Sequence, residues 1–191
     1  MNKRIILTLY IIFSFCIATV AYAEDVNLKL VLNKLAAIKH IKSDFVEMKM
    51  ISMLDNNIKL SGELEYTAPD VLIKKTLKPT PELFTVKGNS LHVKNSAGEN
   101  IELLLTNYSV VAMFVEAYRG VLSGDLEKLK EFYDISFKGN SEQWSITLIP
   151  IDDEGLEIIE RIVIEGMAAT VSKYTTFEAS GDKIVMRVKN K

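Results

Sequence analysis

The residues able to do acid–base or nucleophilic chemistry match no catalytic motif in their spacing. The two histidines, His40 and His92, lie far apart, and neither belongs to a metal-binding H-E-x-x-H motif. The acidic triplet Asp152, Asp153 and Glu154 lacks the alternating ligands and distal glutamate of a calcium loop. The sequence contains no G-x-S-x-G nucleophile elbow and no glycine-rich phosphate loop. We therefore expect no enzymatic activity, no metal and no cofactor.

The N-terminus has the three parts of a secretory signal peptide. A basic head ends at Arg4, an apolar run spans residues 5–20, and a small-x-small triplet ends at Ala23. We expect cleavage after Ala23, which removes 1–23 and leaves 24–191 as a single domain in the periplasm. An uncleaved membrane anchor is the alternative, but the run is shorter than the ~20 residues that a membrane span needs.

Removal of this segment also removes the only cysteine and two positive charges. Cys16 lies in the apolar run, so the mature chain can form no internal disulfide. A lipoprotein signal at Cys16 is a further alternative, but that residue follows a phenylalanine rather than small residues. Loss of Lys3 and Arg4 changes the formal net charge from −2 to −4 (two cations fewer). This mild acidity argues against a nucleic-acid partner.

Hydrophobic periodicity divides the remaining chain into strands and a few helices. Apolar residues at three- and four-residue spacing predict helices over 24–42 and 110–122, with a shorter one over 126–133. Alternation predicts about eleven strands, beginning with 45–54 and 58–67. Short turns between them require antiparallel neighbours. Since only two or three helices are available to cover the sheet, we expect a curved sheet that wraps around them, closed or nearly closed.

Several apolar side chains are candidates for the lining of a cavity inside this sheet. Strand 58–67 alternates clearly, and its apolar face carries Leu60, Leu64 and Tyr66. The preceding strand has both faces partly apolar; we assign Val46, Met48 and Met50 to the cavity, and Phe114 from the middle helix. Methionine often lines surfaces that accept varied apolar partners, although ordinary core packing is the alternative.

These pieces, in this order, resemble the LolA family of periplasmic lipoprotein carriers. The similar segments are S-D-F-V-E at 43–47, S-G-E-L-E-Y-x-x-P at 61–69 and V-K-G-N-S-L-H-V at 86–93. A LolA-like branch also shows L-x-K-x-T-L-x-P-x-P-E, found here at 72–82. The resemblance implies a mainly β fold with helices (α+β): an unclosed antiparallel β-barrel whose helical lid covers an apolar cavity for acyl chains.

The sequence departs from the lipoprotein carriers at two positions. Ala68 stands where they have an arginine that ties to the lid, and Lys74 stands where they have an aromatic residue. The resemblance places Leu72 and Lys74 toward the cavity and Lys75 on the outer face. We expect Lys74 to pair with the phosphate or carboxylate of a bound lipid. The alternative is that both lysines are surface residues that discourage pairing of an edge strand.

Together these features predict a monomeric periplasmic protein that shelters the acyl chains of a lipoprotein or lipid for transport towards the outer membrane. Each buried methylene contributes about 0.8 kcal/mol, so burial of an acyl chain is sufficient for binding. Such a carrier implies a donor at the inner membrane and an acceptor at the outer membrane. One alternative is a sensor or interaction module that recognises lipidated or protein partners with the same half-barrel. Another is an esterase, for which a nucleophile motif is missing.

Overall fold

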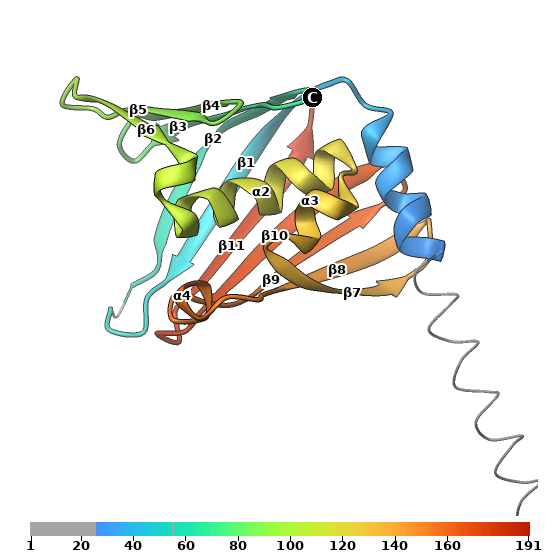
Figure 1. The fold of residues 1–191 in the computed structure, drawn as a ribbon. Helices are drawn as coiled ribbons and strands as arrows, with labels where there is room; N and C mark the ends of the chain where they lie inside the picture. Colours follow the sequence, from blue (N-terminus) through green and yellow to red (C-terminus); the bar gives the residue numbers. More distant parts are fainter. Residues whose placement is uncertain (1–25, 55) are drawn as a thin grey trace, which may run out of the picture.

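Eleven antiparallel strands form one strongly curved sheet (Figure 1). The structure, a computed structural model, describes residues 26–54 and 56–191, so the predicted signal peptide lies outside the described residues. The strands are β1 (His40–Met50), β2 (Ile58–Thr67), β3 (Val71–Lys78), β4 (Glu82–Lys87), β5 (Ser90–Lys94), β6 (Asn100–Leu104), β7 (Tyr133–Gly139), β8 (Gln143–Pro150), β9 (Ile159–Met167), β10 (Thr170–Glu178) and β11 (Lys183–Asn190).

The sheet is open, and its first and last strands are neighbours at its centre. The strand order is β6-β5-β4-β3-β2-β1-β11-β10-β9-β8-β7, so β6 and β7 are the two free edges. Each strand from β1 to β6 and from β7 to β11 pairs with the next along the chain, as expected for short turns. The prediction of an unclosed antiparallel barrel of about eleven strands with helices is confirmed.

Helices cover the concave face of this sheet. Residues 26–36 are helical, followed later by the 3₁₀ turn η1 (Leu105–Asn107) and the helices α2 (Ser109–Ser123), α3 (Leu126–Lys130) and α4 (Asp153–Leu156). Figure 1 shows α2 running across the hollow of the sheet, with the N-terminal helix beside one end of it. Gly124 ends α2 in the left-handed conformation, and a Cβ at this position would lie 2.6 Å from the carbonyl oxygen of Leu32.

The first helix is shorter than its periodicity predicts. The prediction of helix over 24–42 is wrong beyond residue 36, because β1 already begins at His40. There the backbone pairs with β2, so that His40 lies opposite Thr67 and Asp44 opposite Glu63. The chain end adds a further bond, from the amide of Lys191 to the carbonyl of Lys42 (3.1 Å). Pairing in the sheet therefore overrides the local helical preference of this segment.

The interior contains two clusters of buried apolar side chains of unequal size. The larger one packs the N-terminal helix and one side of α2 onto β7–β11, and it includes Leu32, Met113, Ile146 and Ile164. The smaller one joins the N-terminal half of α2 to β4 and β5; its buried members are Val86, Leu91, Leu105, Ala112 and Val115. Helix α2, the lid, therefore packs against both halves of the sheet. Side chains at the edge of both clusters border the space described below.

A phenylalanine packed over a glycine fixes the face that β1 turns inward. Phe45 lies directly opposite Gly62 of β2, and a Cβ on Gly62 would be 2.9 Å from the Phe45 ring. The same Cβ would lie 1.9 Å from the carbonyl oxygen of Lys75 in β3, where the β2–β3 register shifts. Only glycine fits this close approach of backbone and ring.

Candidate functional site

An apolar groove lies between the lid helix α2 and strands β1–β5. The sheet contributes Leu64, Leu72, Phe84, Val86 and Leu91, and α2 contributes Val111, Phe114, Val115 and Tyr118. The groove has a cavity volume of about 280 Å³. This volume is close to the lower end of the range of roughly 300–1,000 Å³ that sites for small molecules span, and apolar walls are typical of such sites.

A second hollow, the inner pocket, adjoins this groove. Leu64, Leu72 and Tyr118 border both spaces, so the two are immediate neighbours. The inner pocket has a cavity volume of about 40 Å³ and continues toward Ile41, Ser43, Tyr66, Val188 and Asn190. Along β1 the two spaces extend from Ser43 to Lys49, about 20 Å at ~3.3 Å per residue. The combined space is long and narrow, a shape that suits an extended hydrocarbon chain.

Buried tyrosines form the wall between the two spaces and the main core. The rings of Tyr118 and Tyr174 stack with their centroids 4.3 Å apart. Burial raises the pKa of the Tyr118 hydroxyl far above its usual range, and the charge of Glu47 acts in the same direction. Burial also raises the pKa of Tyr174. Both hydroxyls therefore stay neutral near neutral pH.

Five of the nine residues predicted to line a cavity border these spaces. Leu64, Leu72, Lys74 and Phe114 line the groove, and Tyr66 lines the inner pocket. Leu60 is on the same face of β2 as Leu64, but it packs against the larger core cluster rather than lining either space. Whether these residues bind a ligand stays a prediction, since the geometry shows only where they lie.

The face assigned to β1 is wrong. Val46, Met48 and Met50 lie on the outer face of the sheet, and Val46 is 40% exposed. The inward residues are Ser43, Phe45 and Glu47, which are 3%, 2% and 3% exposed. The strand carries apolar residues on its outer face and a carboxylate on its inner face, so hydrophobicity alone selects the wrong side. The fit of Phe45 over Gly62 decides the register instead.

A charged cluster of three residues lies in the wall of the groove. Lys74 donates a 2.6 Å hydrogen bond from Nζ to Oε2 of Glu47, and Nζ of Lys49 is 3.9 Å from Oε1 of the same carboxylate. Glu47 is buried, whereas the lysine side chains are 29% and 39% exposed. Lys74 thus points inward as the resemblance implied, but it already has a partner within the chain. The sequence analysis did not identify Glu47 and Lys49 as groove residues, although alternation along β1 places both on the same face as Phe45.

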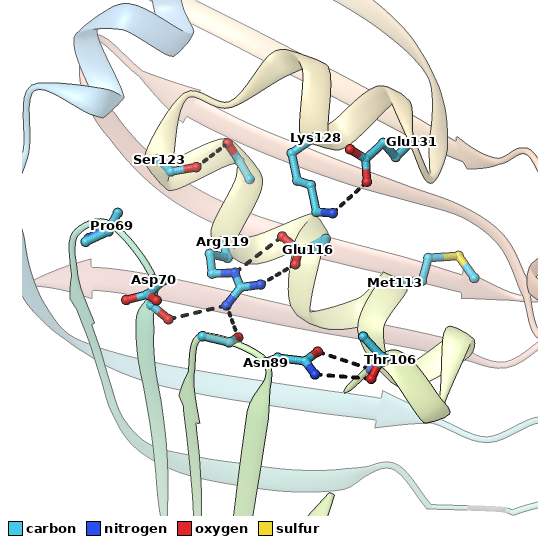
Figure 2. A network of polar contacts seen from close by, with 12 residues as sticks. Pro69, Asp70, Asn89, Thr106, Met113, Glu116, Arg119, Ser123, Lys128 and Glu131 are labelled. Atoms are coloured by element: carbon cyan, nitrogen blue, oxygen red, sulfur yellow. Dashed lines mark hydrogen bonds and ion pairs between the residues drawn. The ribbon is translucent and has the colours of Figure 1, made fainter. Parts of the chain in front are cut away.

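An arginine on the lid helix ties α2 to the tips of two hairpins (Figure 2). Arg119 donates from Nη1 to the carbonyl oxygen of Gly88 in the β4–β5 turn (2.5 Å), with a longer contact to that of Asp70 in the β2–β3 turn (3.4 Å). Its other nitrogens pair with the buried carboxylate of Glu116, one turn earlier on α2. Since these bonds join distant parts of the chain, no local spacing marks Arg119 in the sequence.

A second polar contact fixes the start of the lid to the same β4–β5 turn. Asn89 donates from Nδ2 to Oγ1 of Thr106 (3.1 Å), and its Oδ1 accepts from the amide of Thr106 (3.1 Å). The amide of Leu105 also donates to the carbonyl of Asn89 (2.8 Å). The hairpin thus holds both η1 and the middle of α2, which closes the lid over the groove.

A comparison with protein families matches residues 20–185 to the family described as outer membrane lipoprotein carrier protein LolA-like. The chain belongs to this LolA-like family. The matched segment includes every strand except the last residues of β11, all the residues that border the groove, and those that border the inner pocket except Val188 and Asn190. A comparison with curated protein sequences found no match.

The solved structures found by comparison share little sequence with this chain. A LolA superfamily protein from Nitrosomonas europaea is 11% identical, with a TM-score of 0.46 over 83% of this chain and 90% of that one. A DUF1329 family protein from Desulfovibrio piger is 10% identical, with a TM-score of 0.49 over 85% and 88% of the two chains. A putative outer membrane lipoprotein-sorting protein domain from Vibrio parahaemolyticus is 11% identical, with a TM-score of 0.46 over 87% and 93%.

The tie of this lid comes from another part of the chain than the resemblance led us to expect. Ala68 stands where the resemblance led us to expect the arginine that ties to the lid. Here Arg119 extends in the opposite direction, from the lid to the hairpins. The carbonyl of Pro69, next to Ala68, accepts instead from the hydroxyl of Tyr66 (3.0 Å).

The groups considered for catalysis lie apart from the groove and have ordinary partners. His40 and His92 are exposed; His40 contacts Oγ1 of Thr67 (2.9 Å), and His92 lies 3.7 Å from Glu102. Asp152 caps α4 by accepting from the amide of Gly155 (2.6 Å). Within 26–54 and 56–191, no cluster of three or more acidic, histidine or cysteine side chains could hold a metal ion. The helices of the described chain are too short or too polar to cross a membrane.

Proposed function

We propose that this protein is a non-enzymatic periplasmic carrier or binding protein that shelters the acyl chains of a lipid or lipoprotein on the way to the outer membrane. The observation that supports this most is the elongated apolar space whose walls come from both the lid and the sheet. Membership of the LolA-like family is consistent with this role. Binding in such a space requires no polar contact, because each methylene removed from water contributes about 0.8 kcal/mol.

The proposal includes an export step and a single mature domain. We expect the signal peptide to be removed after Ala23, so that 24–191 reaches the periplasm as a soluble monomer. N-terminal sequencing of the protein recovered from the periplasm should start at Glu24. A sequence that starts at Met1, or recovery only with membranes, would contradict this part of the proposal.

Native mass spectrometry of protein expressed with its signal peptide tests the binding role. The expected spectrum shows a mass adduct that carries acyl chains and disappears after extraction with organic solvent. A donor at the inner membrane and an acceptor at the outer membrane are expected if the bound molecule is cargo in transit. A protein that never carries lipid, even when incubated with membrane extract, would argue against the carrier role and for the alternative of a sensor of protein partners.

A further inference from the structure

The charged cluster in the groove leaves one positive charge without a balancing negative charge. Three charged residues line the groove: Glu47, Lys49 and Lys74. A buried carboxylate requires a paired cation, and Lys74 at 2.6 Å provides it directly. Lys49 lies at 3.9 Å from the same carboxylate, beyond direct hydrogen-bonding distance, and its side chain is 39% exposed. Its ammonium is therefore the group in this wall that can accept a further anionic partner.

Lys49 is also placed at one end of the combined space, where a polar headgroup would lie. It is near the C-terminal end of β1, beside Thr176 and Ile184 in the groove wall. The inner pocket, at the other end of β1, is lined almost entirely by apolar and neutral side chains, with Glu65 as its charged member. A chain with one polar end would therefore bury its tail toward the inner pocket and leave its headgroup near Lys49.

We infer that the preferred ligand is a lipid with a single anionic headgroup, a carboxylate or a phosphate, which pairs with Lys49 while Glu47 holds Lys74 as an internal pair. This inference rests on the proposed function and narrows its ligand class. It differs from the expectation from sequence, which gave the headgroup to Lys74. A partly exposed ammonium adds modest affinity for an anion and discriminates against a neutral headgroup by the same amount, since the neutral headgroup gains nothing from it.

Competition against a neutral fluorescent probe, N-phenylnaphthylamine, separates this inference from the proposed function. The competitors share one hydrocarbon tail: hexadecanol is neutral, hexadecanoate carries a carboxylate, and hexadecyl phosphate carries a phosphate. Near neutral pH, the wild-type protein should bind the better of the two anions about tenfold more tightly than the alcohol. The difference between the two anions identifies the headgroup. The preference should weaken with added salt, because Lys49 is open to solvent.

Two variants assign the preference to one lysine. In Lys49→Gln the affinities for anion and alcohol should become equal, with the affinity for alcohol unchanged. Lys59→Gln, an exposed lysine opposite Met48 on the outer face, is the matched control and should keep the preference. The double variant Glu47→Gln/Lys74→Met removes no net charge and should also keep it.

The outcomes distinguish the inference about the headgroup from the proposed function. If alcohol and anions displace the probe equally from the wild-type protein, the inference is overturned and the acyl groove stands. If the preference survives in Lys49→Gln but is lost in the double variant, Lys74 is the headgroup site and the inference is wrong. If none of the competitors binds, both the inference and the proposed function fail.

Discussion

The guanidinium of Arg119 on α2 donates a 2.5 Å hydrogen bond to the carbonyl oxygen of Gly88, so the lid is held directly to the tip of the β4–β5 hairpin. The same side chain neutralises Glu116, which is buried in the lid. Arg119 therefore has two roles: it balances a buried charge and it closes the lid over the groove. A ligand that enters or leaves between α2 and the hairpins must break this contact.

Arg119→Lys separates these two roles. Lysine keeps the positive charge beside Glu116, but its single ammonium cannot reproduce the planar arrangement of donors that also reaches Gly88. We expect the dissociation rate of a bound fluorescent probe to rise about fivefold to tenfold, from the loss of one charged hydrogen bond. Stopped-flow measurement of probe release checks this. Arg187→Lys, on the exposed side of β11, is the control, and equal release rates in both variants would show that the lid contact is not limiting.

Gly62→Ala tests the packing that sets the inner face of β1. The added Cβ would lie 1.9 Å from the carbonyl oxygen of Lys75 and 2.9 Å from the Phe45 ring, so strands β1–β3 must shift apart. We expect a loss of about 2 kcal/mol or more in the free energy of unfolding, as for other overpacked sites. Urea denaturation followed by the fluorescence of Trp144 provides the measurement. Ser61→Ala on the other face should unfold almost like the wild type; a Gly62→Ala variant of unchanged stability would refute the close approach.

An aspartate that joins two loops predicts a change of stability in acid. Asp182 accepts from the amide and the hydroxyl of Ser52 (2.8 Å each), and these two hydrogen bonds hold its pKa below the ordinary value of 3.8. A carboxyl with a lowered folded-state pKa contributes stability that is complete above its unfolded value and is lost as the pH falls through the folded one. Asp182→Asn should therefore lower the Tm near neutral pH, and the difference from wild type should shrink only below about pH 4.

The same comparison needs a control that lacks the loop contact. Asp134→Asn, an exposed aspartate on β7, should show no such pH-dependent difference. If Asp182→Asn tracks the wild type at every pH, the bonds to Ser52 contribute nothing measurable to stability.

Sequence alone was sufficient where one face of a strand is clearly apolar. In β2 the alternation of Leu60, Leu64 and Tyr66 with polar residues predicted both the bounds of the strand and its inward face. The resemblance to the LolA family predicted two further features: that the barrel is open and that Lys74 points inward. These features depend on local pattern or on the order of short motifs, which a single sequence contains.

Sequence alone failed to predict the inward face of a strand where a buried polar group reverses the hydrophobic pattern. Glu47 lies inside and Val46 outside because Phe45 must pack over Gly62, and this contact joins two strands. The pairing of Glu47 with Lys74 connects residues 27 positions apart, and the Arg119 bonds connect α2 with two separate turns. No periodicity within one element records such contacts, so the charged cluster and the lid tie were visible only in the structure.

The proposed function requires that one acyl-sized ligand occupies the space between α2 and the sheet, and a bulky side chain that fills this space tests the requirement. Leu64→Trp places a large ring where the groove and the inner pocket meet, without adding a charge. An acidic substitution would be a poorer test, because Leu64 lies opposite Lys74, which could pair with a new carboxylate. Val46→Trp adds the same ring to the outer face and is the matched control.

Equilibrium titration of delipidated protein with N-phenylnaphthylamine is the measurement. We predict saturable binding at a single site in the wild type and in Val46→Trp, and at least about tenfold weaker binding in Leu64→Trp, because the ring excludes the ligand from the shared part of the space. Thermal unfolding of all three proteins confirms that they are folded at the titration temperature. No saturable binding to the wild type, or equal affinity in folded Leu64→Trp and Val46→Trp, would contradict the proposed function.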